Sequence, residues 1–138
     1  MGSKSGKRFW RVLAVGACVS MWAAPAAFAH HSAAPFDMNK EIELKGMVKE
    51  IQWTNPHAWI QVNVKQDNGS VVEWSFETEG PNVLTRAGIY RNTLQPGDIV
   101  TVKGHPLKDG RPGATMITVG KADGSVLSLN PDLRKPAE

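Results

Sequence analysis

The sequence predicts a mainly β fold: a small OB-like barrel of five to six strands with one short helix between strands 3 and 4. Three observations support this. Apolar and polar residues alternate in several short runs, turn residues separate the runs, and one segment with helical signals follows the third run. Three strands, a helix and two or more strands is the element order of the OB-fold, a five-stranded Greek-key barrel. The predicted barrel domain covers residues 41–130.

The first predicted strand starts at Glu41 and changes face along its length. The apolar residues before position 49 share one parity, whereas Ile51 and Trp53 have the other. Successive side chains of a strand point to opposite faces, so the change near Lys49–Glu50 predicts a β-bulge or a sharp bend. Gly46 would ease the coiling of this long strand.

The second and third strands are predicted to form a hairpin over residues 57–65 and 71–78. Asn68-Gly69 between them indicates a tight turn of type I′, which requires positive φ angles. The alternation assigns each side chain to a face. Ile60, Val62, Val64, Val72, Trp74 and Phe76 are expected to face the core, and Gln61, Asn63, Lys65, Glu73, Ser75 and Glu77 to face outward.

A short helix is predicted over residues 80–88. Pro81 suits the first helical turn, Gly88 suits the C′ position, and Leu84 and Ala87 belong to an apolar stripe. Strands follow at 99–104, 114–121 and 126–129, and residues 131–138 form a polar tail that we expect to be mobile.

Residues 1–29 have the pattern of a cleaved signal peptide. Residues 1–11 contain four basic and no acidic side chains, an uncharged and largely apolar run of 13 residues follows, and Ala27-Phe28-Ala29 provides small residues for cleavage before His30. A membrane-spanning helix would need a run of about 20 apolar residues. Acylation at Cys18, within a sequence like a lipobox, remains an alternative.

Export changes the charge of the protein. The full chain has a formal net charge of +3, whereas the part after Ala29 has 12 basic and 13 acidic residues and no cysteine. A net charge of −1 argues against nucleic acid as a partner. We also find no G-x-S-x-G elbow, no phosphate-binding glycine loop before a helix and no Cys-x-x-Cys pair, so we do not expect an enzyme.

The histidines suggest a metal site in the predicted N-terminal arm, residues 30–40. After cleavage, His30 would offer both its α-amine and its imidazole to one metal ion, and His31 or His57 could add a second imidazole. This nitrogen-rich set suits Cu(II), with Asp37 as a possible oxygen ligand. The alternative is a solvated arm with only adventitious metal affinity.

The Asn55–Trp59 loop between the first two strands is a second candidate site. In an OB barrel this loop lies beside the common ligand face, and Trp53, Asn55, His57 and Trp59 could form a binding patch there. Alternatively, Trp53 caps the core and His57 holds the turn through a backbone carbonyl. His105 is expected to lie at the surface, at a strand end.

These motifs also resemble a family of short exported bacterial proteins that is known only as a domain of unknown function. The resemblance covers nearly the whole exported part, with its most specific part at Asn55-Pro56-His57. It implies a periplasmic, OB-like barrel and no established activity. The matching segments are His30-His31-Ser32, Phe36-Asp37, Gly46 to His57, Gly80 to Gly88 and Leu94 to Pro106.

Two functional hypotheses follow, both for a non-enzymatic periplasmic protein. The first is an accessory protein that binds a divalent metal, copper, through His30, His31 and His57. The second is a module that binds an envelope protein or a small envelope ligand through the Asn55–Trp59 loop, without metal.

Overall fold

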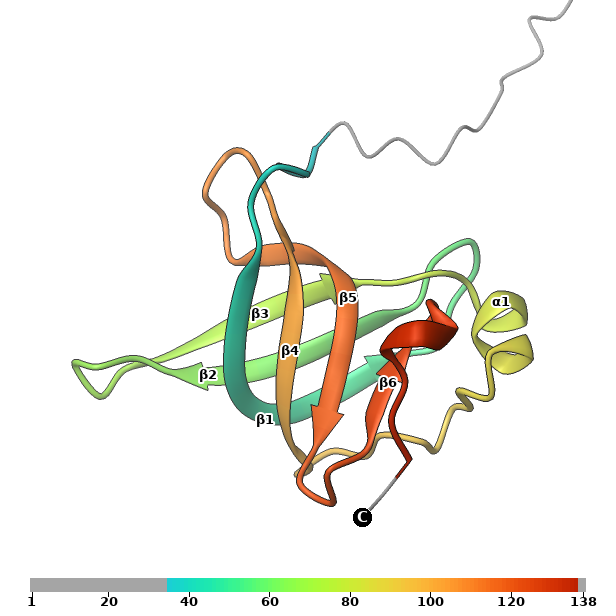
Figure 1. Ribbon diagram of the computed structural model, residues 1–138. Helices are drawn as coiled ribbons and strands as arrows, with labels where there is room; N and C mark the ends of the chain where they lie inside the picture. The colour runs from blue at the N-terminus through green and yellow to red at the C-terminus, as the bar shows by residue number, and fades with distance from the viewer. Residues whose placement is uncertain (1–34, 137–138) are drawn as a thin grey trace, which may run out of the picture. The chain divides into compact units, whose positions relative to one another are not determined.

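Six strands and one short α-helix follow one another in the predicted order along residues 35–136, the part of the chain that the computed structural model describes (Figure 1). The helix lies between the third and fourth strands, so the predicted mainly β fold is confirmed. The elements are β1 (Ile42–Gln52), β2 (Trp59–Lys65), β3 (Val71–Glu77), α1 (Pro81–Arg86), β4 (Ile99–Pro106), β5 (Gly113–Lys121), β6 (Val126–Ser128) and a 3₁₀ helix, η1 (Pro131–Leu133).

Five strands close into a barrel through one parallel pairing. The sheet order is β3-β2-β1-β4-β5-β6, and β3 also pairs with β5. This closing pair is parallel, with Ser75 opposite Gly113, while the other pairs of neighbouring strands are antiparallel. The order is that of an OB-like barrel, with β6 as an extra strand on β5.

The predicted change of face in β1 is a β-bulge. The register between β1 and β2 shifts between Val48 and Glu50, which leaves Lys49 as the extra residue. The first half of β1 pairs with β4 and the second half with β2, and the strand curves strongly between them (Figure 1). Gly46 lets the strands approach here, because a Cβ at this position would lie 2.6 Å from the carbonyl oxygen of Asn63.

Alternating side chains from all five strands fill the barrel. Phe76 is fully buried, and Trp74 packs against it with ring centroids 6.1 Å apart. Gln61 keeps the predicted alternation, between the core residues Ile60 and Val62, but it is only 8% exposed. It lies in the middle of the sheet, opposite Glu50 on one side and Ser75 on the other. The buried core comprises Val48, Ile60, Val62, Val64, Phe76, Leu94, Val100, Val102, Ala114 and Val119.

The β2–β3 turn differs from the predicted type I′. Gly69 has a φ of 85°, but no non-glycine residue within 35–136 has a positive φ. The N–H of Gly69 donates to the carbonyl of Gln66 (2.9 Å), and the N–H of Gln66 donates to the carbonyl of Ser70 (2.8 Å). This is a three-residue loop with a glycine bulge. Such a loop needs a positive φ only at Gly69, and the side chain of Asn68 accepts the N–H of Ser70 at 2.9 Å.

Helix α1 begins at a proline and ends in a Schellman motif. Gly88 has a φ of 79°, and its N–H donates to the carbonyl of Thr85, while the N–H of Ile89 donates to the carbonyl of Leu84 (2.9 Å). The motif brings Leu84 and Ile89 together with Ala58 in a second buried cluster, against which Trp53 packs. The short helix therefore closes one end of the barrel (Figure 1).

Segments before the first strand and after the last strand also contact the barrel. In the predicted arm, Phe36 is buried and pairs with Leu107. In the tail that was expected to be mobile, Lys135 pairs with Val126, and Arg134 Nε donates to the Ser128 carbonyl at 2.7 Å. Residues 131–136 thus have defined contacts with β6. Over residues 35–136, no helix has the length and apolar character needed to cross a membrane.

Candidate functional site

The loop between β1 and β2 is fixed at its base by hydrogen bonds. The Thr54 hydroxyl donates to the His57 carbonyl at 2.8 Å. The N–H of Ala58 donates to the carbonyl of Glu79 (3.3 Å), and the N–H of Thr78 donates to the carbonyl of Ala58 (3.0 Å). The loop is therefore attached to the end of β3, with the exposed Asn55-Pro56 at its tip, joined by a cis peptide bond.

His57 pairs with a carboxylate on the neighbouring strand. Its Nδ1 contacts Oε1 of Glu77, and the two side chains are only 25% and 18% exposed. Residues 57 and 59 share a face, and the β2–β3 register places Trp59 opposite Glu77, which brings this carboxylate to His57. The sequence did not point to this carboxylate, because a local turn pattern contains no information on cross-strand register.

An open groove of about 520 Å³ lies between this loop and the start of α1. Asn55 and Pro56 form one wall, and the segment from Glu79 to Val83 forms the other. Gly80 makes the close approach possible, since a Cβ there would overlap the Pro56 carbonyl oxygen. The side chains of Asn55, Glu79 and Asn82 make no hydrogen bond to any residue in the described range. Their polar groups are thus available to a partner.

The two tryptophans of the predicted patch have different surroundings. Trp53 packs against Ala58 and Leu84 at the closed end of the barrel. Trp59 is half-buried on β2, opposite Gln52 and Glu77. Trp53 therefore covers part of the core, and the exposed part of the loop is formed by Asn55 and Pro56.

The predicted metal ligands are only partly described. His30 and His31 lie outside residues 35–136. Asp37 forms an ion pair with Lys40 (3.2 Å), and this pair lowers the pKa of its carboxyl group. Within the described range, no three His, Cys, Asp or Glu side chains gather in a way that could hold a metal ion. A site that includes His57 would therefore need ligands from outside this range.

His105 lies near the end of β4, as expected, and is only half-buried. Its Nδ1 lies 2.7 Å from the Lys40 carbonyl oxygen, a contact that links the predicted arm to the barrel.

Sequence reasoning missed the second wall of the groove. Glu79 and Asn82 lie 24 and more residues after the loop tip along the chain, and the helix signals at Gly80-Pro81 explained that segment without a functional role. The signal that could have found them is the OB-like topology itself, because it places the end of the third strand beside the loop between the first two strands.

The model of a family of unknown function, DUF6152, matches residues 17–116. The chain belongs to this family. The DUF6152 match contains both walls of the groove and ends within β5. No match was found among curated proteins or among solved structures.

Proposed function

We propose that this DUF6152 protein is an exported, periplasmic binding protein without catalytic activity, and that it recognises a partner through the groove between the Asn55–Trp59 loop and α1. One observation carries the proposal. The Asn-Pro and Gly-Pro-Asn motifs, distant in sequence, line one groove whose polar side chains make no hydrogen bond within residues 35–136.

The groove chemistry suits an extended peptide segment with a basic side chain. The amides of Asn55 and Asn82 can both donate to and accept from a peptide backbone. The Glu79 carboxylate can pair with a Lys or Arg of the partner, and such charge-assisted hydrogen bonds are about twice as strong as neutral ones. Pro56 and Val83 supply apolar contact beside these groups.

Site-specific photo-crosslinking in the producing cells tests this proposal. Val83 is 42% exposed in the groove, and Val71 is 61% exposed at the other end of β3, so a photoreactive residue at each position gives a matched pair. We expect one defined adduct from position 83 and none of the same mass from position 71. Equal adducts from both positions, or none from position 83, would contradict the proposal.

Binding of the crosslinked partner can then be measured with purified variants. Glu79→Gln should weaken binding about tenfold, because it removes a charge-assisted hydrogen bond at nearly constant shape. Glu43→Gln, at an exposed position on β1 away from the groove, is the control and should bind normally. Equal affinities of the two variants would remove the groove from the partner interface.

Export is tested by the intact mass of the protein recovered from the periplasm. Cleavage after Ala29 predicts a chain that starts at His30. A mass that corresponds to an acylated chain starting at Cys18 would favour the lipoprotein alternative. A mass that includes residues 1–17 would contradict both forms of export.

Copper binding by His30, His31 and His57 is a second candidate function, favoured by the contact between His57 and Glu77. Metal-ligating histidines commonly donate their other ring N–H to a carboxylate, which fixes the orientation of the ring. Titration of the processed protein with Cu(II) should therefore show an affinity that the double variant His30→Ala, His31→Ala loses. Equal affinity of the two proteins would exclude the site.

A further inference from the structure

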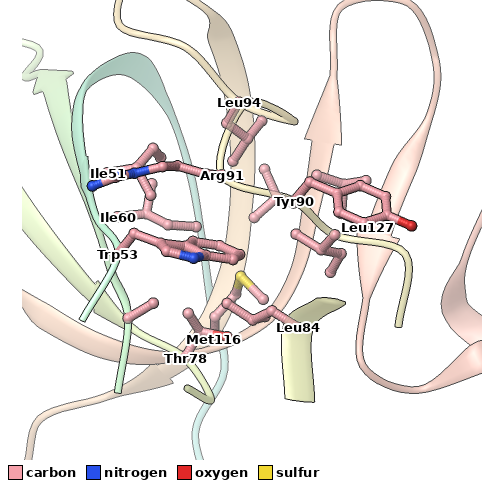
Figure 2. Close-up of a pocket in the computed structure, with 13 residues that line it drawn as sticks. Ile51, Trp53, Ile60, Thr78, Leu84, Tyr90, Arg91, Leu94, Met116 and Leu127 are labelled. Atoms are coloured by element: carbon pink, nitrogen blue, oxygen red, sulfur yellow. The ribbon is translucent and has the colours of Figure 1, made fainter. Parts of the chain in front are cut away.

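A narrow apolar pocket lies at the end of the barrel that α1 closes (Figure 2). It separates the main core from the second cluster, and Trp53, Leu84 and Leu127 form much of its wall. The enclosed space is about 20 Å³, and about 390 Å³ when the open mouth is included. The enclosed part has room for about one water molecule. This pocket is distinct from the groove, so a ligand in the pocket is independent of a partner in the groove.

A polar atom with no partner lies in this apolar wall. The Thr78 hydroxyl lines the pocket, the residue is only 7% exposed, and Oγ1 has no hydrogen-bond partner among the described residues. Leaving a buried hydroxyl without a partner costs about 1–3 kcal/mol, so native proteins rarely retain one without a reason. The hydroxyl could form the missing bond with a ligand in the pocket.

A cation without an acidic partner lies at the mouth. Arg91 is exposed, lines the pocket and forms no ion pair with any residue in the described range. Figure 2 shows Arg91 and Thr78 on opposite sides of the Trp53 ring. A ligand that reaches both groups must therefore lie along the indole of Trp53.

We infer that this pocket binds a small aromatic carboxylate with a hydroxyl group at its far end. The carboxylate would pair with the Arg91 guanidinium, the ring would lie against Trp53, and the hydroxyl would hydrogen-bond to Thr78 Oγ1. The enclosed space is smaller than a ring, so binding requires side chains of the pocket wall to move apart. Arg91 and Tyr90 both line the pocket and are exposed, and exposed side chains change rotamer within nanoseconds.

Calorimetric titration of the protein purified from its producing cells with 4-hydroxybenzoate, benzoate and phenol tests this inference. We expect 4-hydroxybenzoate to bind most tightly, because it can satisfy both polar anchors. Arg91→Ala should weaken both carboxylates about tenfold. Lys65→Ala should change neither affinity, because it removes an exposed cation that forms no ion pair within residues 35–136 and does not line the pocket.

The Thr78→Val variant separates the two anchors. It should weaken 4-hydroxybenzoate about fivefold and leave benzoate within about twofold, because only the first ligand reaches the hydroxyl. If this variant does not fold, Thr78→Ser should retain the preference for 4-hydroxybenzoate. The inference fails if no ligand binds at millimolar concentration, if both variants bind like the natural protein, or if a crystal structure with 4-hydroxybenzoate shows only a water on Thr78.

Discussion

The two buried clusters of this barrel are built in different ways. In the main cluster, the residues that come from strands are held in place by strand pairing. The central side chains of Val62, Phe76 and Val119 are completely buried. In the cluster at the α1 end, Ala58 comes from a loop, Leu84 from the helix and Ile89 from the segment after it. This end contains a pocket and the Thr78 hydroxyl, which has no hydrogen-bond partner among residues 35–136.

The difference in packing indicates that the two regions have different roles. A close-packed interior maximises stability, whereas a cavity and an unsatisfied polar group reduce it. The α1 end retains both features and lies next to the groove, so we expect stability to depend mainly on the strands and recognition mainly on this end. Substitutions in the two regions can test that expectation.

The largest difference should come from truncating one large side chain in each cluster. Phe76→Ala should lower the free energy of unfolding by about 3–5 kcal/mol, as expected for a fully packed aromatic residue. Leu84→Ala should cost only about 2–3 kcal/mol, the low end for buried leucine, because Leu84 already borders empty space.

Chemical denaturation of both variants measures this difference, with Val83→Ala at an exposed position of the same helix as the control. A loss for Leu84→Ala that equals the loss for Phe76→Ala would show that the α1 end is packed as tightly as the barrel centre.

The strand-built region could be predicted almost completely from the sequence, because alternation along each strand fixes which side chains face inward. The bulge at Lys49 and the helix end at Gly88 also have local signatures, a change of parity and a glycine at C′. The parallel contact between β3 and β5 entered the prediction only through the element order, since no local pattern specifies it.

The site could be predicted only in part, because its contacts join residues that are distant in sequence. The sequence drew attention to His57 and Asn55, but the Glu77 partner depends on the β2–β3 register. The groove forms because Gly80 approaches the Pro56 carbonyl. The Thr78 hydroxyl is buried only when several elements pack around it. Such properties exist only once the chain is folded.

Glycine substitutions give the next largest difference between the regions. Gly46→Ala should cost about 1–3 kcal/mol, because the new Cβ would lie 2.5 Å from a Val62 methyl group and 2.6 Å from the Asn63 carbonyl oxygen in the barrel wall. Gly88→Ala, at the end of α1, should cost about 1 kcal/mol, because the new Cβ would meet no atom of the described residues beyond its own chain neighbourhood within 4 Å and only the positive φ of 79° is unfavourable.

Thermal unfolding of the two alanine variants measures the difference. Gly88→Asn is the matched control and should cost less than Gly88→Ala, since asparagine tolerates positive φ better. If Gly88→Ala were the more damaging of the two alanine substitutions, the end of α1 would be more constrained than the barrel wall.

Thr78→Val should change stability in the opposite direction. It removes, at nearly constant shape, a buried hydroxyl that has no hydrogen-bond partner in the described part of the chain. We therefore expect the free energy of unfolding to rise by about 1 kcal/mol in the absence of ligand. Ser128→Ala is the contrasting control. The Ser128 hydroxyl is also buried, but it donates to the Ile117 carbonyl at 2.9 Å, so its removal should lower the free energy of unfolding. A destabilised Thr78→Val variant in denaturant titrations would mean that the hydroxyl already contributes to the fold.

The smallest effect concerns an ion pair on the barrel wall. Lys103 Nζ lies 2.6 Å from Oε2 of Glu41, and this hydrogen bond and charge hold the pKa of Glu41 below its ordinary value of 4.5. A carboxyl group whose pKa is lowered by folding stabilises the protein above its unfolded pKa, and this contribution is lost as the pH falls through the lower, folded pKa. Glu41→Gln should therefore flatten the decline of stability below about pH 4.5. Both side chains are about half exposed, so water screens the pair and the change in stability should be smaller than in the three predictions above.

Denaturation midpoints between pH 2 and pH 7 would measure the effect of Glu41→Gln. Lys103→Gln should flatten the same part of the curve because it removes the same interaction. If the decline of stability at low pH is unchanged in both variants, the Lys103–Glu41 pair contributes nothing to stability.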